Sequence, residues 1–175
     1  MERRLALYTF AVFARPAEDP ANDGFHRRND AVFAAAERAP GFIARSGYTD
    51  DPGPESWGVE TYPRFYVERG DGWSPATLSL WTGLEPAFAF SYGRRHREAL
   101  KHRRSWFVRG EWPSHALWWV EADRRPEWAE AARKLERLHD FGPGPDVFDF
   151  GTPFDPEGVP ARIDVDKARP LHAAD

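Results

Sequence analysis

The chain has 175 residues, a formal net charge of −4, and 8 Trp, 13 Phe and 5 Tyr against a single Met. This length suits one domain with a sizeable core, and so many rings suit a ligand pocket or an apolar interface as well as a core. The acidic balance gives no general drive towards nucleic acid or an anionic membrane. Because the chain has no cysteine, disulfides, thiolate metal ligands, iron–sulfur clusters and a cysteine nucleophile are excluded.

The N-terminal segment, MERRLALYTFAVFARP, contains a short apolar run. It has no small-residue cleavage site and turns polar well before it reaches the length of a membrane span. Apolar residues occupy both alternating faces of residues 5–14, which predicts a β-strand that is covered on both sides. We therefore expect a cytoplasmic protein with no membrane segment.

The remaining elements follow from the spacing of apolar residues and from turn residues between them. Pro40 and Gly41 end the first helix, and Thr82 to Glu85 form a capping-box pattern that opens the central one. In chain order we expect a helix over 25–39, strands over 42–48, 64–68 and 76–81, a helix over 83–107, a strand over 115–121 and a helix over 126–139.

This order predicts an α+β fold of the ferredoxin-like, split βαβ type, with an additional C-terminal helix. In such a fold the helices cover one face of the sheet, yet the strands over 5–14 and 115–121 are apolar on both faces. A second copy of the sheet would cover the other face and give a homodimeric α/β barrel; alternatively, residues 140–175 fold back over it. We expect one domain over 1–158 and a partly extended tail over 159–175, with the last ten residues or so frayed.

The expected helix over 83–107 places one histidine, His96, on a stripe that is otherwise aromatic and aliphatic and includes Phe88 and Tyr92. The segment 94–104 carries six Arg or Lys residues against one Glu. Such a charge cluster can attract an anionic ligand, although it is more often the solvated side of a helix.

Three roles are open for His96. It can be a hydrogen-bonded core residue, a general base with Tyr92 orienting the substrate, or an axial haem ligand. In the last case aromatic walls would flank the ring, and Arg95 or Arg103 would lie near the propionates.

The other histidines give weaker indications. His26 falls in the first turn of a helix, where the dipole disfavours a protonated ring, so it is either neutral or held by an anionic partner, and it is a further catalytic candidate. His102 lies about 120° around the helix from His96, and no HExxH motif is present. We therefore expect no dedicated metal site.

The sequence contains no GxSxG, GxGxxG or Walker-type motif, which argues against an α/β-hydrolase, a dinucleotide-binding or a P-loop protein. The aromatic residues favour a hydrophobic small molecule as partner, bound in a cavity between sheet and helix. About half of these rings should be plain core or interface. The substrate-binding candidates are Tyr8, Phe10, Tyr66, Trp81, Phe88 and Trp119.

Several segments together resemble an uncharacterised bacterial family, domain of unknown function 3291, across residues 5–158. They are PANDGFHRRND, GFIARSGY, PRFYVERGDGWSPATLSLW, YGRRHREALKHRRSWF with WPSHALWWV, and LERLHDFGPGPDVFDFGTPFD. The family looks like part of the dimeric α/β-barrel superfamily, with antibiotic-biosynthesis monooxygenase-like, haem-degrading and chlorite-dismutase-like proteins. The resemblance implies the fold and the dimer but no single activity. It also implies that His96 stands where several haem-using members carry their ligand.

The function expected from these observations is a small-molecule tailoring enzyme that acts on an apolar aromatic or polycyclic substrate by monooxygenase-like or acid–base chemistry. The cofactor is either none or haem. The alternatives are a haem protein with His96 as axial ligand and a non-catalytic ligand-binding protein.

Overall fold

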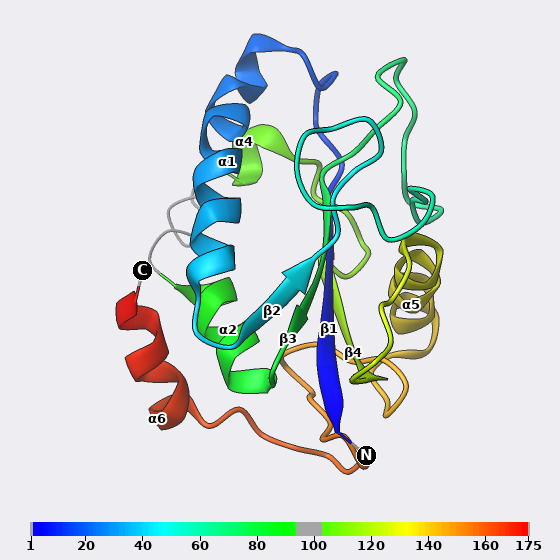
Figure 1. The fold of residues 1–175 in the computed structure, drawn as a ribbon. Helices are drawn as coiled ribbons and strands as arrows, with labels where there is room; N and C mark the ends of the chain where they lie inside the picture. Colours follow the sequence, from blue (N-terminus) through cyan, green and yellow to red (C-terminus); the bar gives the residue numbers. More distant parts are fainter. Residues whose placement is uncertain (1, 94–102, 175) are drawn as a thin grey trace.

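The computed structural model describes residues 2–93 and 103–174, which form an α+β fold (Figure 1). Within these residues no helix is both long and apolar enough to span a bilayer. The strands are β1 (Arg3–Phe10), β2 (Phe42–Arg45), β3 (Ala76–Trp81) and β4 (His115–Glu121). The helices are α1 (Asp23–Arg38), α2 (Leu84–Tyr92), α4 (Arg103–Trp106), α5 (Trp128–Phe141) and α6 (Val165–Ala168), with the 3-10 turns η1 (Pro20–Asn22) and η2 (Arg169–Ala174).

The four strands form one antiparallel sheet in the order β2-β3-β1-β4. Strand β3 therefore separates β1 from β2, and β1 lies at the centre with partners on both sides. Successive residues of β1 point to opposite faces, and Leu5, Ala6, Leu7 and Tyr8 are all buried. The continuous apolar run of β1 thus reflects a strand that is covered on both faces, as its composition predicts.

One face of the sheet, here called the α5 face, is closed by helix α5 and by the long connection over residues 46–75 (Figure 1). Apolar residues recur every three or four positions along α5 and are buried against the sheet. Full burial of one such aliphatic side chain contributes about 1.5–3 kcal/mol. The sheet residues of this face include Ala6, Tyr8, Phe10, Leu78, Leu80, Trp118 and Val120, and the helix residues are Trp128, Ala131, Leu135 and Leu138.

The opposite face, here called the α2 face, packs against α2 and against a returning segment of the C-terminal region. Figure 1 shows α1 on the same side of the sheet as α2, with α5 on the other side. Phe148 forms an isolated β-bridge with Leu117, and both are fully buried. The α2 face consists of Leu5, Leu7, Trp81 and Leu117 of the sheet, Leu84 and Ala87 of α2, and Phe148, Phe150 and Phe154.

Both faces are therefore covered within a single chain. Tyr8, Leu78 and Trp118 on the α5 face are exposed by no more than 1%, so no second copy is needed to shield them. Residues after 140 do fold back over the sheet, but onto the α2 face, where Phe148 and Phe154 pack beside α2. The face expected to lack a helix is covered by α5 and the connection over residues 46–75 instead.

The central helix is shorter than the sequence predicts. Helix α2 ends at Tyr92 because Gly93 takes an extended conformation, with φ −61° and ψ 169°, and glycine is a poor helix residue. Residues 94–102 lie outside the described part of the chain. Helix α4 ends at Trp106, and Phe107, expected to be helical, instead forms a β-bridge with Phe13.

The expected strand over 64–68 is absent. Tyr66 donates its backbone N–H to the carbonyl of Pro63 at 2.9 Å, so a turn bends the chain in the middle of the expected strand. Of the residues that favour a strand here, Phe65 and Tyr66 instead pack against the α5-face core, whereas Val67 is exposed. The first strand also ends early, at Phe10 rather than Ala14.

The expected tail is more ordered than its composition predicts. Asp164 caps α6 by accepting backbone N–H groups from Asp166 and Lys167, and Ala168 is fully buried. Helices α6 and η2 pack against α2, so this segment belongs to the layer that covers the α2 face.

Candidate functional site

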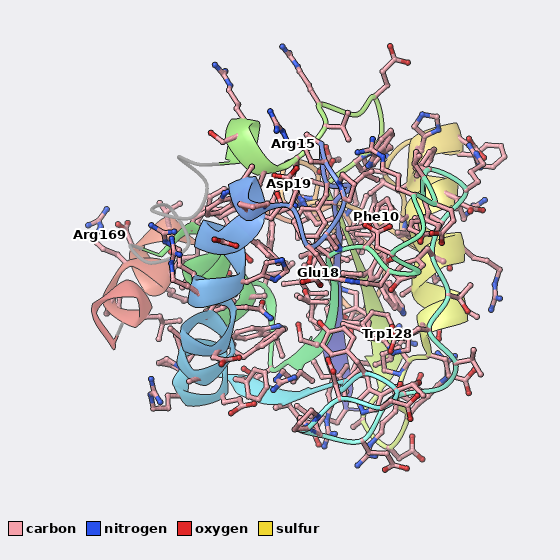
Figure 2. The ribbon with its side chains drawn as sticks, turned by 90° about the horizontal axis from the view of Figure 1, so that it is seen from above. Phe10, Arg15, Glu18, Asp19, Trp128 and Arg169 are labelled. Atoms are coloured by element: carbon pink, nitrogen blue, oxygen red, sulfur yellow. The ribbon has the colours of Figure 1, made fainter. Side chains whose placement is uncertain are left out.

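The six aromatic residues predicted to bind substrate do not share one cavity. Tyr8, Phe10 and Tyr66 belong to the α5 face, whereas Trp81, Phe88 and Trp119 belong to the α2 face. Seen from above, Figure 2 places Phe10 and Trp128 on the side of the sheet that carries α5. The sheet separates the two groups, so any site uses one group only.

Three of these residues are closed core positions. Tyr8, Phe10 and Trp81 are exposed by 2% or less. The Trp81 indole donates its N–H to Ser79 Oγ at 2.9 Å, and its ring stacks on Phe90 with centroids 5.2 Å apart. Trp81 therefore has the environment of a core residue rather than of a ligand contact.

An aromatic cluster with an accessible rim lies at the C-terminal end of α2. Phe88 and Tyr92 are four residues apart on one helical face, with ring centroids 4.6 Å apart. Phe150 meets both rings edge-on, at 5.6 Å from Phe88 and 5.8 Å from Tyr92. Tyr92 is 39% exposed, more than Phe88 or Phe150, so it is the member of this cluster that is most accessible from solvent.

The electrostatic surroundings of Tyr92 favour the neutral phenol. Partial burial raises the pKa of Tyr92, and the nearby carboxylate of Asp149 raises it further. At neutral pH the hydroxyl is therefore a hydrogen-bond donor, which is the property required to orient a carbonyl or phenolate oxygen.

His115 joins this cluster from strand β4. Its ring lies 5.1 Å from that of Phe150, and its Nε2 accepts the backbone N–H of Phe150 at 3.3 Å. Nδ1 lies 3.3 Å from Ser114 Oγ, so this arrangement assigns the proton to Nδ1. The sequence places His115 on the same side of its strand as Leu117 and Trp119; its contact with Phe150 was not predicted, because Phe150 arrives from a distant, irregular segment.

Most of the residues predicted to carry the chemistry lie outside the part of the chain that the structure describes. His96 and Arg95 lie in the undescribed segment 94–102. Arg103 begins α4, and its side chain is also outside the described part. In the sequence, His96 follows Tyr92 by four residues.

His26 lies in a separate aromatic cluster at the start of α1. Its Nε2 is 2.8 Å from the carbonyl oxygen of Ala17, which identifies Nε2–H as the donor. Its ring packs near Phe13, Phe25 and Trp73, at 5.5–6.0 Å. The partner is thus a neutral carbonyl, so a neutral imidazole satisfies the contact, and the bond holds the loop before α1 in place.

A second group of tyrosines lies on the α5 face. The Tyr48 hydroxyl donates to the carbonyl of Ala76 at 2.7 Å, and the Tyr66 hydroxyl donates to Glu68 at 2.6 Å. Burial, reinforced by Glu60, raises the pKa of Tyr62 to about 12, and burial also raises the pKa of Tyr48 and Tyr8. These phenols are neutral donors over the physiological range.

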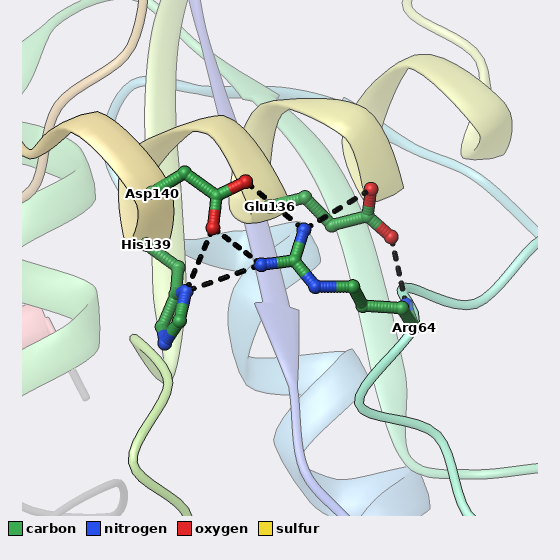
Figure 3. A network of polar contacts seen from close by, with 4 residues as sticks. All are labelled: Arg64, Glu136, His139 and Asp140. Carbon is green, nitrogen blue, oxygen red and sulfur yellow. Dashed lines mark hydrogen bonds and ion pairs between the residues drawn. The ribbon is translucent and has the colours of Figure 1, made fainter.

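A network of charged side chains fastens the connection over 46–75 to α5 (Figure 3). The backbone N–H of Arg64 donates to Glu136 at 2.7 Å, and its guanidinium makes a two-pronged contact with Asp140. The hydrogen bond from Arg64, followed by that from His139, holds the pKa of Asp140 at about 2. These side chains are partly exposed. They link the connection over residues 46–75 to helix α5.

The described residues contain no group of three or more His, Asp or Glu side chains suited to a metal ion. A surface hollow of about 280 Å³ opens near Trp119, whose indole N–H donates to the carbonyl of Phe154. Two of its charged residues are in ion pairs, Lys134 with Asp146 at 2.5 Å and Arg3 with Glu121 at 3.4 Å, and Arg3 also donates to the carbonyl of Pro156. The hollow is lined by Arg3, Trp119, Lys134, Pro145, Asp146, Pro156, Glu157 and Gly158.

Comparison with protein families gives a match over residues 4–164 to the model described as Domain of unknown function (DUF3291). The chain belongs to this family. The match to DUF3291 spans all four strands and helices α1, α2, α4 and α5, so both faces of the sheet and the clusters described above lie within the family's domain. No match to the chain was found among curated proteins or among solved structures.

Proposed function

We propose that this DUF3291 protein is a small-molecule enzyme that binds an apolar aromatic substrate beside Tyr92 and processes it by acid–base chemistry. The observation that carries the proposal is the position of Tyr92, a neutral phenol that is 39% exposed at the rim of an otherwise apolar aromatic cluster. Rings and one placed donor are the usual elements of a small-molecule site.

Each residue has a defined part in the proposed chemistry. Phe88, which is half-buried and backed by the buried Phe150, offers an apolar surface for a flat ring, and Tyr92 donates to an oxygen of the substrate. His96 is the proposed proton acceptor, since an imidazole titrates near neutral pH. A substrate whose carbanion is stabilised by neighbouring rings could then react with dioxygen without a cofactor.

The topology supports the fold part of the proposal. In the order β2-β3-β1-β4, strand β3 lies between β1 and β2, which is the order of a ferredoxin-like, split βαβ sheet. A dimeric barrel would bring a second sheet onto the α5 face, where α5 already packs. A homodimer of this chain would therefore use a different surface.

The described residues do not favour haem. Phe88, Tyr92 and Phe150 are all in mutual contact, with centroids 4.6–5.8 Å apart, which leaves no slot between them for a macrocycle. The proposed chemistry therefore uses no haem. Reconstitution tests this directly: a Soret band that His96→Ala abolishes would overturn the cofactor-free proposal.

The experiment for the proposed function uses anthrone, a tricyclic ketone with an acidic C–H. Oxidation of anthrone by dioxygen gives anthraquinone and water, which are followed by absorbance and by oxygen uptake. We expect turnover by the wild-type protein, a loss of about 10²–10⁴-fold in His96→Ala, and a smaller loss in Tyr92→Phe. Tyr66→Phe, on the opposite face of the sheet, is the matched control and should match the wild type. Turnover that is unchanged in both His96→Ala and Tyr92→Phe would refute the assignment.

A further inference from the structure

The hydroxyl of Tyr8 is buried at the centre of the α5 face and has no hydrogen-bond partner among the described residues. Buried polar groups are almost always paired, because an unpaired one loses its bonds to water without replacement. Such an exception in the middle of the core requires a physical reason.

The groups around Tyr8 are aromatic and already engaged. The ring of Trp128 meets it edge-on at 6.3 Å. The Tyr48 hydroxyl is used by the carbonyl of Ala76, and the Tyr62 hydroxyl is 3.3 Å from Glu60. Tyr62, Tyr48 and Glu136 lie close enough to raise the pKa of Tyr8 beyond the effect of burial, so the orphan hydroxyl is a neutral donor in an aromatic setting.

The segment that covers this region, residues 59–68, is here called the strap. It carries Tyr62, Phe65 and Tyr66, which pack against the α5-face core. Phe65 stacks on Trp112 with centroids 5.2 Å apart, and Tyr62 contacts both Phe10 and Tyr66, at 6.4 and 4.7 Å.

The strap is held mainly by side chains. The Glu136 carboxylate of α5 accepts the backbone N–H of Arg64, and the Arg64 guanidinium binds Asp140. Glu60 of the strap accepts the backbone N–H of Thr49 at 2.7 Å. The bond from the Tyr66 N–H to Pro63 is internal to the strap. Exposed ion pairs of this kind contribute little to stability.

The preceding segment, residues 46–57, is held by its backbone. Ser46 donates its N–H to Leu78, and Trp57 accepts the N–H of Trp128. A Cβ at Gly47 would lie 1.6 Å from the carbonyl oxygen of Pro54, so the chain crosses itself too closely for any residue but glycine. Gly58 and Gly70, both with φ near 90°, flank the strap and supply conformations at which it can pivot.

We propose that the strap is a lid over a binding site in which the Tyr8 hydroxyl donates to the carbonyl oxygen of a flat, uncharged aromatic ligand. Opening of the strap moves the rings of Tyr62 and Phe65 outwards, and the ligand takes their place against Phe10 and Trp128. Glu60 and Glu136 lie at the edge of the region and disfavour an anionic ligand. The site lies on the face opposite Tyr92 and does not depend on the proposed function.

The binding experiment compares 9-fluorenone with fluorene, which has the same rings without the carbonyl, by saturation-transfer NMR. We expect saturable binding of fluorenone and a fluorenone-to-fluorene affinity ratio that falls about tenfold in Tyr8→Phe. The carbonyl carbon shift of bound fluorenone should also lose its hydrogen-bonded displacement in this variant. An unchanged ratio in Tyr8→Phe, or the absence of saturable binding, would overturn the proposal.

The stability of Tyr8→Phe tests the premise separately. Since the hydroxyl has no partner among the described residues, its removal should leave the Tm equal or higher. A clearly lower Tm would show that the hydroxyl is bonded in the free protein and would overturn the proposal.

The lid is tested without any change in the site. In hydrogen exchange, we expect residues 59–68 to exchange faster than residues 46–57, and faster still in Arg64→Ala. The control is Arg137→Ala, which removes a similarly exposed ion pair of α5, with Asp146 at 2.9 Å. Equal protection of the two segments in both the wild type and Arg64→Ala would contradict the lid.

Discussion

The α5 face and the α2 face of the sheet are both closed by aromatic side chains, but their hydroxyl groups are placed differently. Four of the five tyrosines belong to the α5 side, where Tyr8 is fully buried. The α2 face has Tyr92, at its accessible rim. The chemistry proposed for the α2 face would therefore be open to a substrate from solvent, whereas the site proposed on the α5 face would bind only after the strap moves.

The largest expected effect concerns the helix that closes the α5 face. Trp128 is 1% exposed and contacts Tyr8 and Tyr48. Trp128→Ala should lower the free energy of unfolding by about 3–5 kcal/mol, because it removes a large buried ring and leaves a cavity. Denaturant titration measures this value. Phe141→Ala, on the same helix but 76% exposed, should change it by no more than about 0.5 kcal/mol; equal effects would mean that α5 does not close this face.

An intermediate effect on stability concerns residues 46–57, the first part of the connection between β2 and β3. Ser46 is buried, and its hydroxyl accepts the N–H of Trp57 at 2.9 Å and donates to the carbonyl of Gly47. Ser46→Ala leaves these groups unpaired and should cost about 1–3 kcal/mol. Thermal denaturation measures this loss of stability, and hydrogen exchange should become faster within residues 46–57. Faster exchange confined to the strap would contradict the division of the connection into residues 46–57 and the strap.

The smallest effect concerns the attachment of the strap and depends on pH. Because the pKa of Asp140 is lowered from its ordinary value to about 2 by Arg64, its carboxylate stabilises the folded state above about pH 4, and this contribution is lost as the pH falls towards 2. Asp140→Asn should therefore be less stable than the wild type at pH 6, with a difference that shrinks towards zero between pH 4 and 2. Asp123→Asn is the control; a difference that grows on acidification would refute the role of this pair.

The sequence predicted the helices and strands whose apolar residues follow a regular spacing. Strands β3 and β4 and helices α1 and α5 were expected nearly at their observed positions, because apolar spacing reports burial directly. The strand expected over 64–68 was wrong, since the turn from Pro63 to Tyr66 and the packing of Phe65 on Trp112 depend on the tertiary structure.

The candidate site was predictable only within one helix. Phe88 and Tyr92 were expected together because residues four apart share a helical face. Three other features depend on irregular segments, whose paths no periodicity specifies. They are the contact of Phe150 with Phe88, the hydrogen bond between Phe150 and His115, and the Tyr8 hydroxyl that has no partner among the described residues. The role of His96 remains a prediction.

The bridge between Leu117 and Phe148 has a further consequence for how the molecule behaves among its own copies. Strand β4 is at the edge of the sheet, and an edge strand offers its unpaired backbone groups to any neighbouring chain. Here Leu117 exchanges both backbone hydrogen bonds with Phe148, at 2.8 and 2.9 Å. The returning segment therefore blocks the middle of the edge and protects the sheet against strand-to-strand aggregation.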